Sequence, residues 1–68
     1  ARNALKSLIS VLTMKESLQT GDSAIDVLWR TLETVQDAAR AAVEPSPGHL
    51  EAQCQIEILI DEYEQASA

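Results

Sequence analysis

The chain has 68 residues, of which 46% are hydrophobic, and a formal net charge of −6 at pH 7. A chain this short makes at most one domain, and it buries only about 60% of its unfolded surface, so its core is thin. The acidic charge argues against nucleic acid as a partner, because binding to phosphate requires Lys and Arg, and no apolar run is long enough to span a bilayer.

Cys54 is the single cysteine of the chain. A disulfide within one chain is therefore excluded, and a lone thiol is typical of a reducing compartment, so we expect a soluble cytoplasmic protein. Small domains without disulfides or metals commonly gain stability from a second subunit, and we therefore expect a homodimer.

The first helix is predicted over residues 4–19. Its apolar side chains follow the helical i, i+3, i+4, i+7 spacing: Leu5, Leu8, Ile9 and Leu12. Val11, Met14 and Leu18 lie on a neighbouring arc and make the apolar stripe wider than one partner helix requires. The stripe therefore predicts two separate contacts for this helix.

A short turn separates the first helix from the second, which is predicted over residues 23–43. Gly21 stands where a helix C-terminus favours a left-handed residue. Ser23 with Asp26 three residues later resembles a capping box, and Asp26 with Arg30 forms a favourable i, i+4 pair. Because short turns join antiparallel neighbours, the first two helices are predicted to form a hairpin.

The second helix has the clearest amphipathic pattern in the chain. Its apolar positions recur at spacings of three and four residues: Ile25, Leu28, Leu32, Val35, Ala39 and Ala42. This spacing is typical of a coiled-coil-like contact and requires at least one partner helix. Trp29 borders the polar side, where it serves either core packing or contact with a partner, in which tryptophan is enriched.

Residues 44–46 form the predicted linker, and the third helix is predicted over residues 47–65. Pro45 disfavours the α conformation of the residue before it, so the second helix must end there. Ser46 as N-cap with Pro47 at the first helical position is a regular helix start.

The third segment carries two conflicting patterns. Residues 53–60 alternate in a way that is typical of a β-strand. The helical interpretation instead places one set of side chains along one face: Ala52, Ile56, Leu59, Tyr63 and Ala66. We favour the helix, because a strand here would have no partner strand within the chain.

On the helical interpretation, the third helix has a second apolar face. Leu50, Cys54 and Ile58 stand at i, i+4 and i+8, roughly opposite the first face. One face packs within the chain, and the other requires a contact outside it. The predicted partner or dimer interface therefore comprises six residues: Leu50, Cys54, Ile58, Trp29, Met14 and Leu18.

No motif in the sequence indicates catalysis. Nucleophile elbows, phosphate-binding glycine loops and paired cysteines with zinc spacing are all absent, so we expect no enzyme and no cofactor. Glu57, Asp61 and Glu64 stand at i, i+4 and i+7, but we interpret them as a solvated acidic face rather than a metal site. Cys54 has acidic neighbours that disfavour a thiolate, so packing is favoured over reactivity.

The sequence therefore predicts an all-α protein with three helices in an up-down-up arrangement, as an antiparallel hairpin plus a third helix, completed by homodimerisation. We expect a small acidic regulator that inhibits or modulates another protein by binding to a basic or apolar docking surface. An antiactivator that covers a dimerisation or DNA-binding surface of a transcription regulator is one example. The alternative is a homo-oligomerisation module from a longer protein, and a third hypothesis is a metal-dependent enzyme.

Overall fold

The computed structural model of the chain describes residues 2–44 and 46–67, with side chains described within residues 4–44 and 46–66. These residues form three α-helices, α1 (Arg2–Thr20), α2 (Ala24–Ala41) and α3 (Pro47–Ser67), and they contain no strand. The all-helical prediction is therefore confirmed for the described residues, and residues 53–60 are helical.

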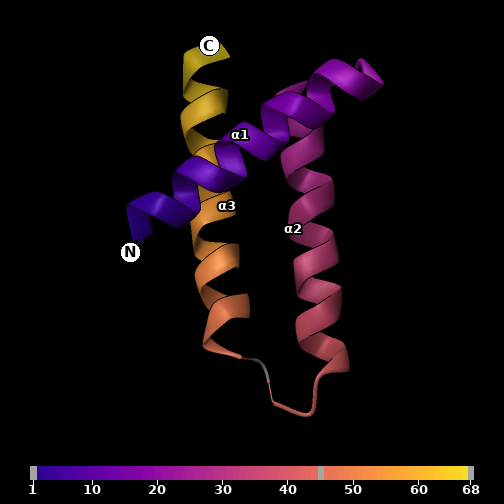
Figure 1. The fold of residues 1–68 in the computed structure, drawn as a ribbon, viewed down its shortest axis with the longest axis vertical. Helices are drawn as coiled ribbons and strands as arrows, with labels where there is room; N and C mark the ends of the chain where they lie inside the picture. The colour runs from indigo at the N-terminus through magenta and orange to yellow at the C-terminus, as the bar shows by residue number, and fades with distance from the viewer. Residues whose placement is uncertain (1, 45, 68) are drawn as a thin grey trace.

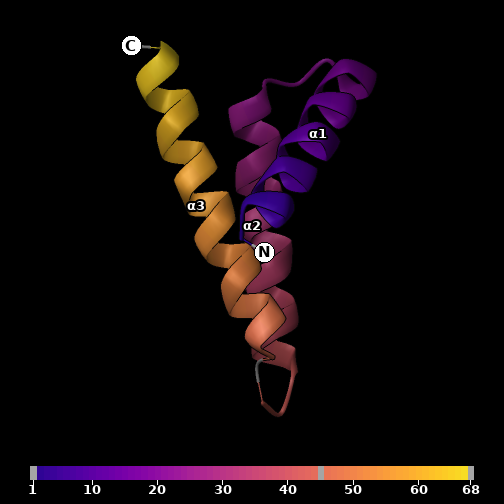
Figure 2. The same cartoon turned by 60° about the vertical axis from the view of Figure 1, so that its left-hand side comes forward.

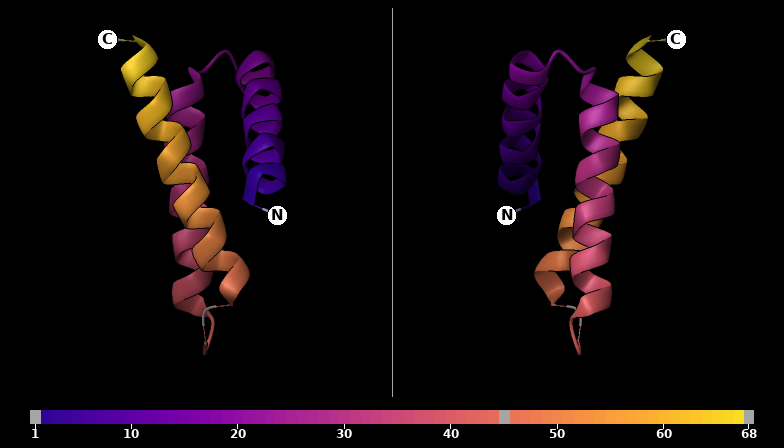
Figure 3. Two further views of the ribbon diagram at one scale, coloured as in Figure 1. Left: turned by 90° about the vertical axis from the view of Figure 1, so that its left-hand side faces the viewer. Right: turned by 90° about the vertical axis from the view of Figure 1, so that its right-hand side faces the viewer.

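Helices α2 and α3 lie side by side and run in opposite directions, with the linker joining them at one end (Figure 1). Helix α1 crosses this pair obliquely, and it stands to one side of the pair when the molecule is turned (Figures 2 and 3). The sequence predicted a hairpin of α1 and α2, whereas α2 and α3 make the most extensive contact. An up-down-up bundle completed by homodimerisation remains a prediction.

The apolar core forms between α2 and α3. Its buried side chains come from these two helices: Leu28, Leu32, Ile56, Leu59 and Ile60. Ile9 of α1, Val35 and Tyr63 are partly buried against this cluster. The predicted apolar faces of the second and third helices therefore do pack within the chain, and they pack mainly against each other. That mutual packing explains why α2 and α3, rather than α1 and α2, are the closest pair.

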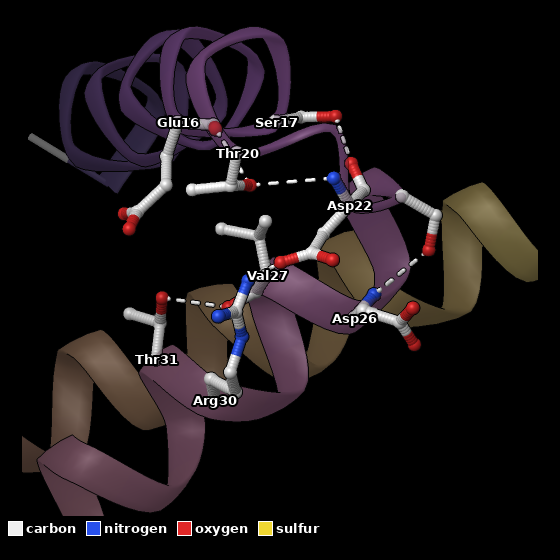
Figure 4. A network of polar contacts seen from close by, with 9 residues as sticks. Glu16, Ser17, Thr20, Asp22, Asp26, Val27, Arg30 and Thr31 are labelled. Carbon is white, nitrogen blue, oxygen red and sulfur yellow. Dashed lines mark hydrogen bonds and ion pairs between the residues drawn. The ribbon is translucent and has the colours of Figure 1, made fainter.

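The start of α2 is capped as the sequence predicts. The hydroxyl of Ser23 accepts a hydrogen bond from the backbone N–H of Asp26 at 3.2 Å. Arg30, however, pairs with Asp22 at 2.8 Å rather than with Asp26 (Figure 4). Asp22 lies in the turn before α2, so the arginine ties the helix to the turn.

Helix α2 ends at Ala41, two residues before the predicted end at residue 43. Ala42 is already extended, with φ −77° and ψ 144°, although its N–H still bonds the Ala38 carbonyl at 3.2 Å. Val43 follows this extended residue and is fully exposed. Pro45, which the sequence predicted to end the helix, lies outside the described residues.

A reciprocal pair of hydrogen bonds caps the start of α3. The His49 N–H donates to Ser46 Oγ at 3.3 Å, and the Ser46 N–H donates to His49 Nδ1 at 3.3 Å. This is the geometry of a capping box, with histidine in place of the usual Glu or Gln. Ser46 is therefore an N-cap, as the sequence predicts, and His49 is its partner.

No helix in the described part of the chain combines the length and the apolar character needed to cross a bilayer.

Candidate protein-interaction surfaces

The turn between α1 and α2 holds the two helices in a defined relation (Figure 4). Gly21 has a φ of +78°, a conformation that only glycine adopts without strain, and its N–H bonds the Ser17 carbonyl at 2.9 Å. Ser17 Oγ also donates to the carbonyl of Asp22, and the Asp22 N–H donates to Thr20 Oγ1 at 3.3 Å. With the ion pair from Arg30, these bonds determine which side of α1 faces the other helices.

The side of α1 that packs on the rest of the chain is largely polar. Thr13 is the buried residue of this side, and its hydroxyl donates to the Ile9 carbonyl at 2.7 Å. Ile9 is the side chain of α1 that packs against the core cluster. Two polar pairs link α1 to α3: Lys6 with Glu62 at 2.8 Å, and Ser10 with Tyr63 at 3.0 Å.

The remaining side of α1 is apolar and largely exposed to solvent, although Leu12 also lines a hollow that α1 shares with α2, and Val11 lines one that it shares with α3. Its large side chains make up what we term the α1 outer face: Leu8, Val11, Leu12, Met14 and Leu18. Val11 is 64% exposed and Leu18 is 83% exposed. Helix α1 is therefore amphipathic, but it presents its apolar side to solvent.

The structure divides the apolar stripe of the first helix between its two sides. The sequence grouped Leu8 and Leu12 with Ile9 by their helical spacing, whereas the structure packs Ile9 against the core cluster and exposes both leucines. Leu8 and Leu12 form one row along the helix, and Ile9 and Thr13 form the adjacent row, rotated by about 100°. Because α1 makes a narrow contact, burying the second row leaves the first row in solvent.

A groove runs between α2 and α3 on the side away from α1. Val27 and Thr31 meet α1 around a small hollow that they share with Ile9, Leu12 and Thr13. Trp29 lies about 160° around α2 from Val27 and Thr31, at about 100° per residue. The groove that Trp29 borders is therefore on the opposite face of the molecule.

One end of this groove has both apolar and acidic side chains in its lining. A hollow of about 360 Å³ is bordered by Trp29 and has Leu32 and Ile60 among its lining residues. Trp29 is 51% exposed, whereas Leu32 and Ile60 are buried. Three exposed carboxylates of α3 line the same hollow: Glu57, Asp61 and Glu64.

The other end of the groove lies toward the linker. Gln36 lines both hollows, and the second has a volume of about 560 Å³ with Leu50, Ala42 and Arg40 in its lining. The Arg40 guanidinium pairs with Asp37 at 2.7 Å, so its charge is locally compensated. We term the two hollows together the α2–α3 groove, and its acidic end is the end that carries Trp29.

The six residues predicted for an interface are all exposed, but they do not form one surface. Trp29 and Leu50 line the α2–α3 groove at its two ends. Met14 and Leu18 belong to the α1 outer face. Cys54 and Ile58 lie on the exposed side of α3 and line neither hollow of the groove.

Sequence reasoning missed the groove and most of the α1 outer face. Two separate features of the sequence indicated the groove. Trp29 bordered the polar side of the second helix, and the three acidic residues of the third helix recurred at helical spacing. Only the antiparallel packing of α2 on α3 brings these parts together. The signal for the α1 outer face was the apolar stripe that was too wide for one contact.

The described side chains form no cluster with the composition of a metal site. Within residues 4–44 and 46–66, no three His, Cys, Asp or Glu side chains converge in a way that could hold a metal ion. Every buried side-chain nitrogen or oxygen in this part of the chain has a hydrogen-bond partner. No orphaned buried group therefore points to a small-molecule ligand.

A search of protein-family models finds no match to this chain, and neither a curated protein nor a solved structure is significantly similar to it.

Proposed function

We propose that this protein is a small helical regulator that binds another protein and thereby inhibits or modulates it. The observation that carries the proposal is the acidic end of the α2–α3 groove, where the half-exposed Trp29 lines the same hollow as the buried side chains Leu32 and Ile60. Tryptophan is enriched among the residues that dominate binding energy at interfaces. An apolar groove between two helices is also a common receptor for an amphipathic helix.

The charge around the groove indicates the chemistry of the partner. Glu57, Asp61 and Glu64 line the acidic end, and the cation Arg40 at the other end is paired with Asp37. A helix with an apolar stripe flanked by Lys or Arg would complement this end in both respects. Basic helices of this kind occur on the DNA-binding surfaces of transcription regulators. Covering such a surface, or a nearby dimerisation surface, is the antiactivator mechanism that we propose.

The test is capture of the partner from an extract of the source cell, followed by a titration with the purified captured protein. Trp29→Ala should weaken binding by at least about tenfold, because loss of an anchor of this kind costs more than about 1.4 kcal/mol. Asp61→Asn should weaken binding mainly at low salt, whereas the charge-matched control Glu44→Gln, which lies outside the groove, should leave it unchanged. A partner that binds wild type and Trp29→Ala equally would contradict the groove proposal.

We also propose a homodimer, since most of the apolar core comes from only two helices and further apolar side chains remain exposed. A second candidate function, a homo-oligomerisation module from a longer protein, is favoured by one observation, the α1 outer face. The metal-dependent enzyme is not carried forward, because no observation on the described residues favours it.

A further inference from the structure

We propose that the α1 outer face is the surface on which two copies of this chain meet, as an antiparallel pair of α1 helices about a two-fold axis. This inference rests on the homodimer proposed above and assigns its surface. It is independent of the α2–α3 groove, which lies on the other side of the molecule and stays open in such a dimer.

The spacing of residues on the outer side of α1 fits a helix pair. Ala4, Leu8, Val11, Lys15 and Leu18 recur at intervals of four, three, four and three residues, which is the spacing of a coiled-coil contact. Ala4 and Lys15 are exposed, like the residues of the α1 outer face. The side of α1 that packs within its own chain lacks this pattern, since its central buried residue is Thr13.

The exposed apolar surface is large enough to contribute most of an interface. The exposed parts of the five side chains amount to on the order of 500 Å² per copy, compared with about 800 Å² per partner in a standard interface. The polar residues beside them on α1 would supply the remainder. An apolar patch of about 500 Å² is as large as the largest patch on a typical monomer, and such patches are often functional.

The distribution of charge selects this face over the exposed side of α3. Residues 1–20 carry a net charge of +2 from Arg2, Lys6, Lys15 and Glu16, whereas residues 45–68 contain five acidic residues and no Lys or Arg. Ile58 has Asp61 and Glu62 at i+3 and i+4, so two copies that met there would bring carboxylates together. Contact through α1 instead keeps the acidic third helices on the far sides of the dimer.

The position of Lys15 determines the direction of the helix pair. In a parallel pair in register, Lys15 would face Lys15 of the second copy in the middle of the contact. In an antiparallel pair, Lys15 meets the N-terminal half of the second α1, where its stem lies along apolar surface and its ammonium reaches water. The antiparallel pair also sets the two helix dipoles in opposite directions.

Two copies could also meet if α1 of one inserted into the α2–α3 groove of the other. The two arrangements differ in whether the assembly is complete at two copies. The α1 outer face and the α2–α3 groove are on opposite sides of the molecule, so that contact would be head-to-tail and would not close at two copies. An isologous contact between two α1 outer faces closes at a dimer and leaves no unpaired copy of the surface.

The test is the mass of the full chain in solution, measured by sedimentation equilibrium up to about 1 mM, the weak limit of useful affinity. Wild type should dimerise, and Val11→Glu should weaken the dimer at least about 100-fold, because it places a carboxylate in a desolvated contact. Ile58→Glu, the same substitution at an exposed apolar residue of α3, should leave the dimer intact. Helical circular dichroism is recorded for each variant, and Val11→Ser with Leu18→Ser replaces Val11→Glu if that variant is unfolded.

Each result bears on a different statement. A wild-type chain that stays monomeric overturns both the homodimer and its assigned surface, and leaves the groove proposal standing. A dimer that survives Val11→Glu overturns only the assigned surface. A mixture of wild type and Lys15→Glu tests the direction of the helix pair, and it should form heterodimers in the statistical ratio. Only a parallel pair places position 15 of one copy opposite position 15 of the other. A strong preference for the heterodimer would therefore overturn the antiparallel direction.

Discussion

At the scale of single residues, helical rotation separates neighbours that the sequence presents as alike. Ile56 and Ile58 are two residues apart, yet Ile56 is 1% exposed and Ile58 is 40% exposed. Ile56 belongs to the core cluster between α2 and α3, and Ile58 points away from it. The same chemical change at these two positions should therefore have different consequences.

Ile56→Glu should destabilise the protein by more than about 3 kcal/mol, because it buries a carboxylate with no partner. Ile58→Glu should change the free energy of unfolding by less than about 1 kcal/mol, as is usual for exposed positions. Chemical denaturation followed by circular dichroism measures both values. Equal losses for the two variants would contradict the packing of α3 described above.

At the scale of the helices, the starts of α2 and α3 depend on a few side-chain to backbone hydrogen bonds. Helix α3 begins with the reciprocal bonds between Ser46 and His49, and α2 begins with the Ser23 cap. The imidazole accepts through Nδ1, so the box requires a side chain with an acceptor at this position. A sequence pattern that admits only Glu or Gln as the second member does not find this box.

His49→Ala should lower the stability of the protein by about 0.5 to 1 kcal/mol, since the Ser46 N–H loses its acceptor. His49→Gln is the matched control, because a glutamine side chain can accept the same bond and should recover most of the loss. Thermal unfolding of the three proteins under one condition checks the order. A full loss with glutamine would show that the imidazole stabilises α3 by packing rather than by capping.

The sequence was sufficient for the helices but not for all of their contacts. The second helix could be predicted closely because its apolar residues form one stripe, and Leu28, Leu32 and Ala39 from that stripe are buried. The first helix could not, because its apolar stripe is wider than one contact and the pattern does not say which part of the stripe is buried. Which part is buried depends on the turn at Gly21, which orients α1, and on the packing of α3 against α2. Both are properties of the folded molecule rather than of one helix.

At the scale of the whole molecule, stability and exposed apolar surface are unevenly distributed. Helices α2 and α3 supply all five buried residues of the core cluster, whereas α1 adds one partly buried isoleucine and two polar pairs to α3. The groove and the α1 outer face lie on opposite sides of this arrangement. The proposed partner and the proposed second copy therefore do not compete for surface.

The polar inner side of α1 has a consequence for the order in which the molecule opens. Few apolar contacts hold α1 to the α2–α3 pair, so α1 should detach in a partial unfolding event before the pair separates. In hydrogen–deuterium exchange, the amides in the middle of α1 should lose protection faster than those around Leu28 and Ile56. If α1 pairs with α1 of a second copy, its exchange should slow as protein concentration rises, whereas exchange in the α2–α3 pair should change less.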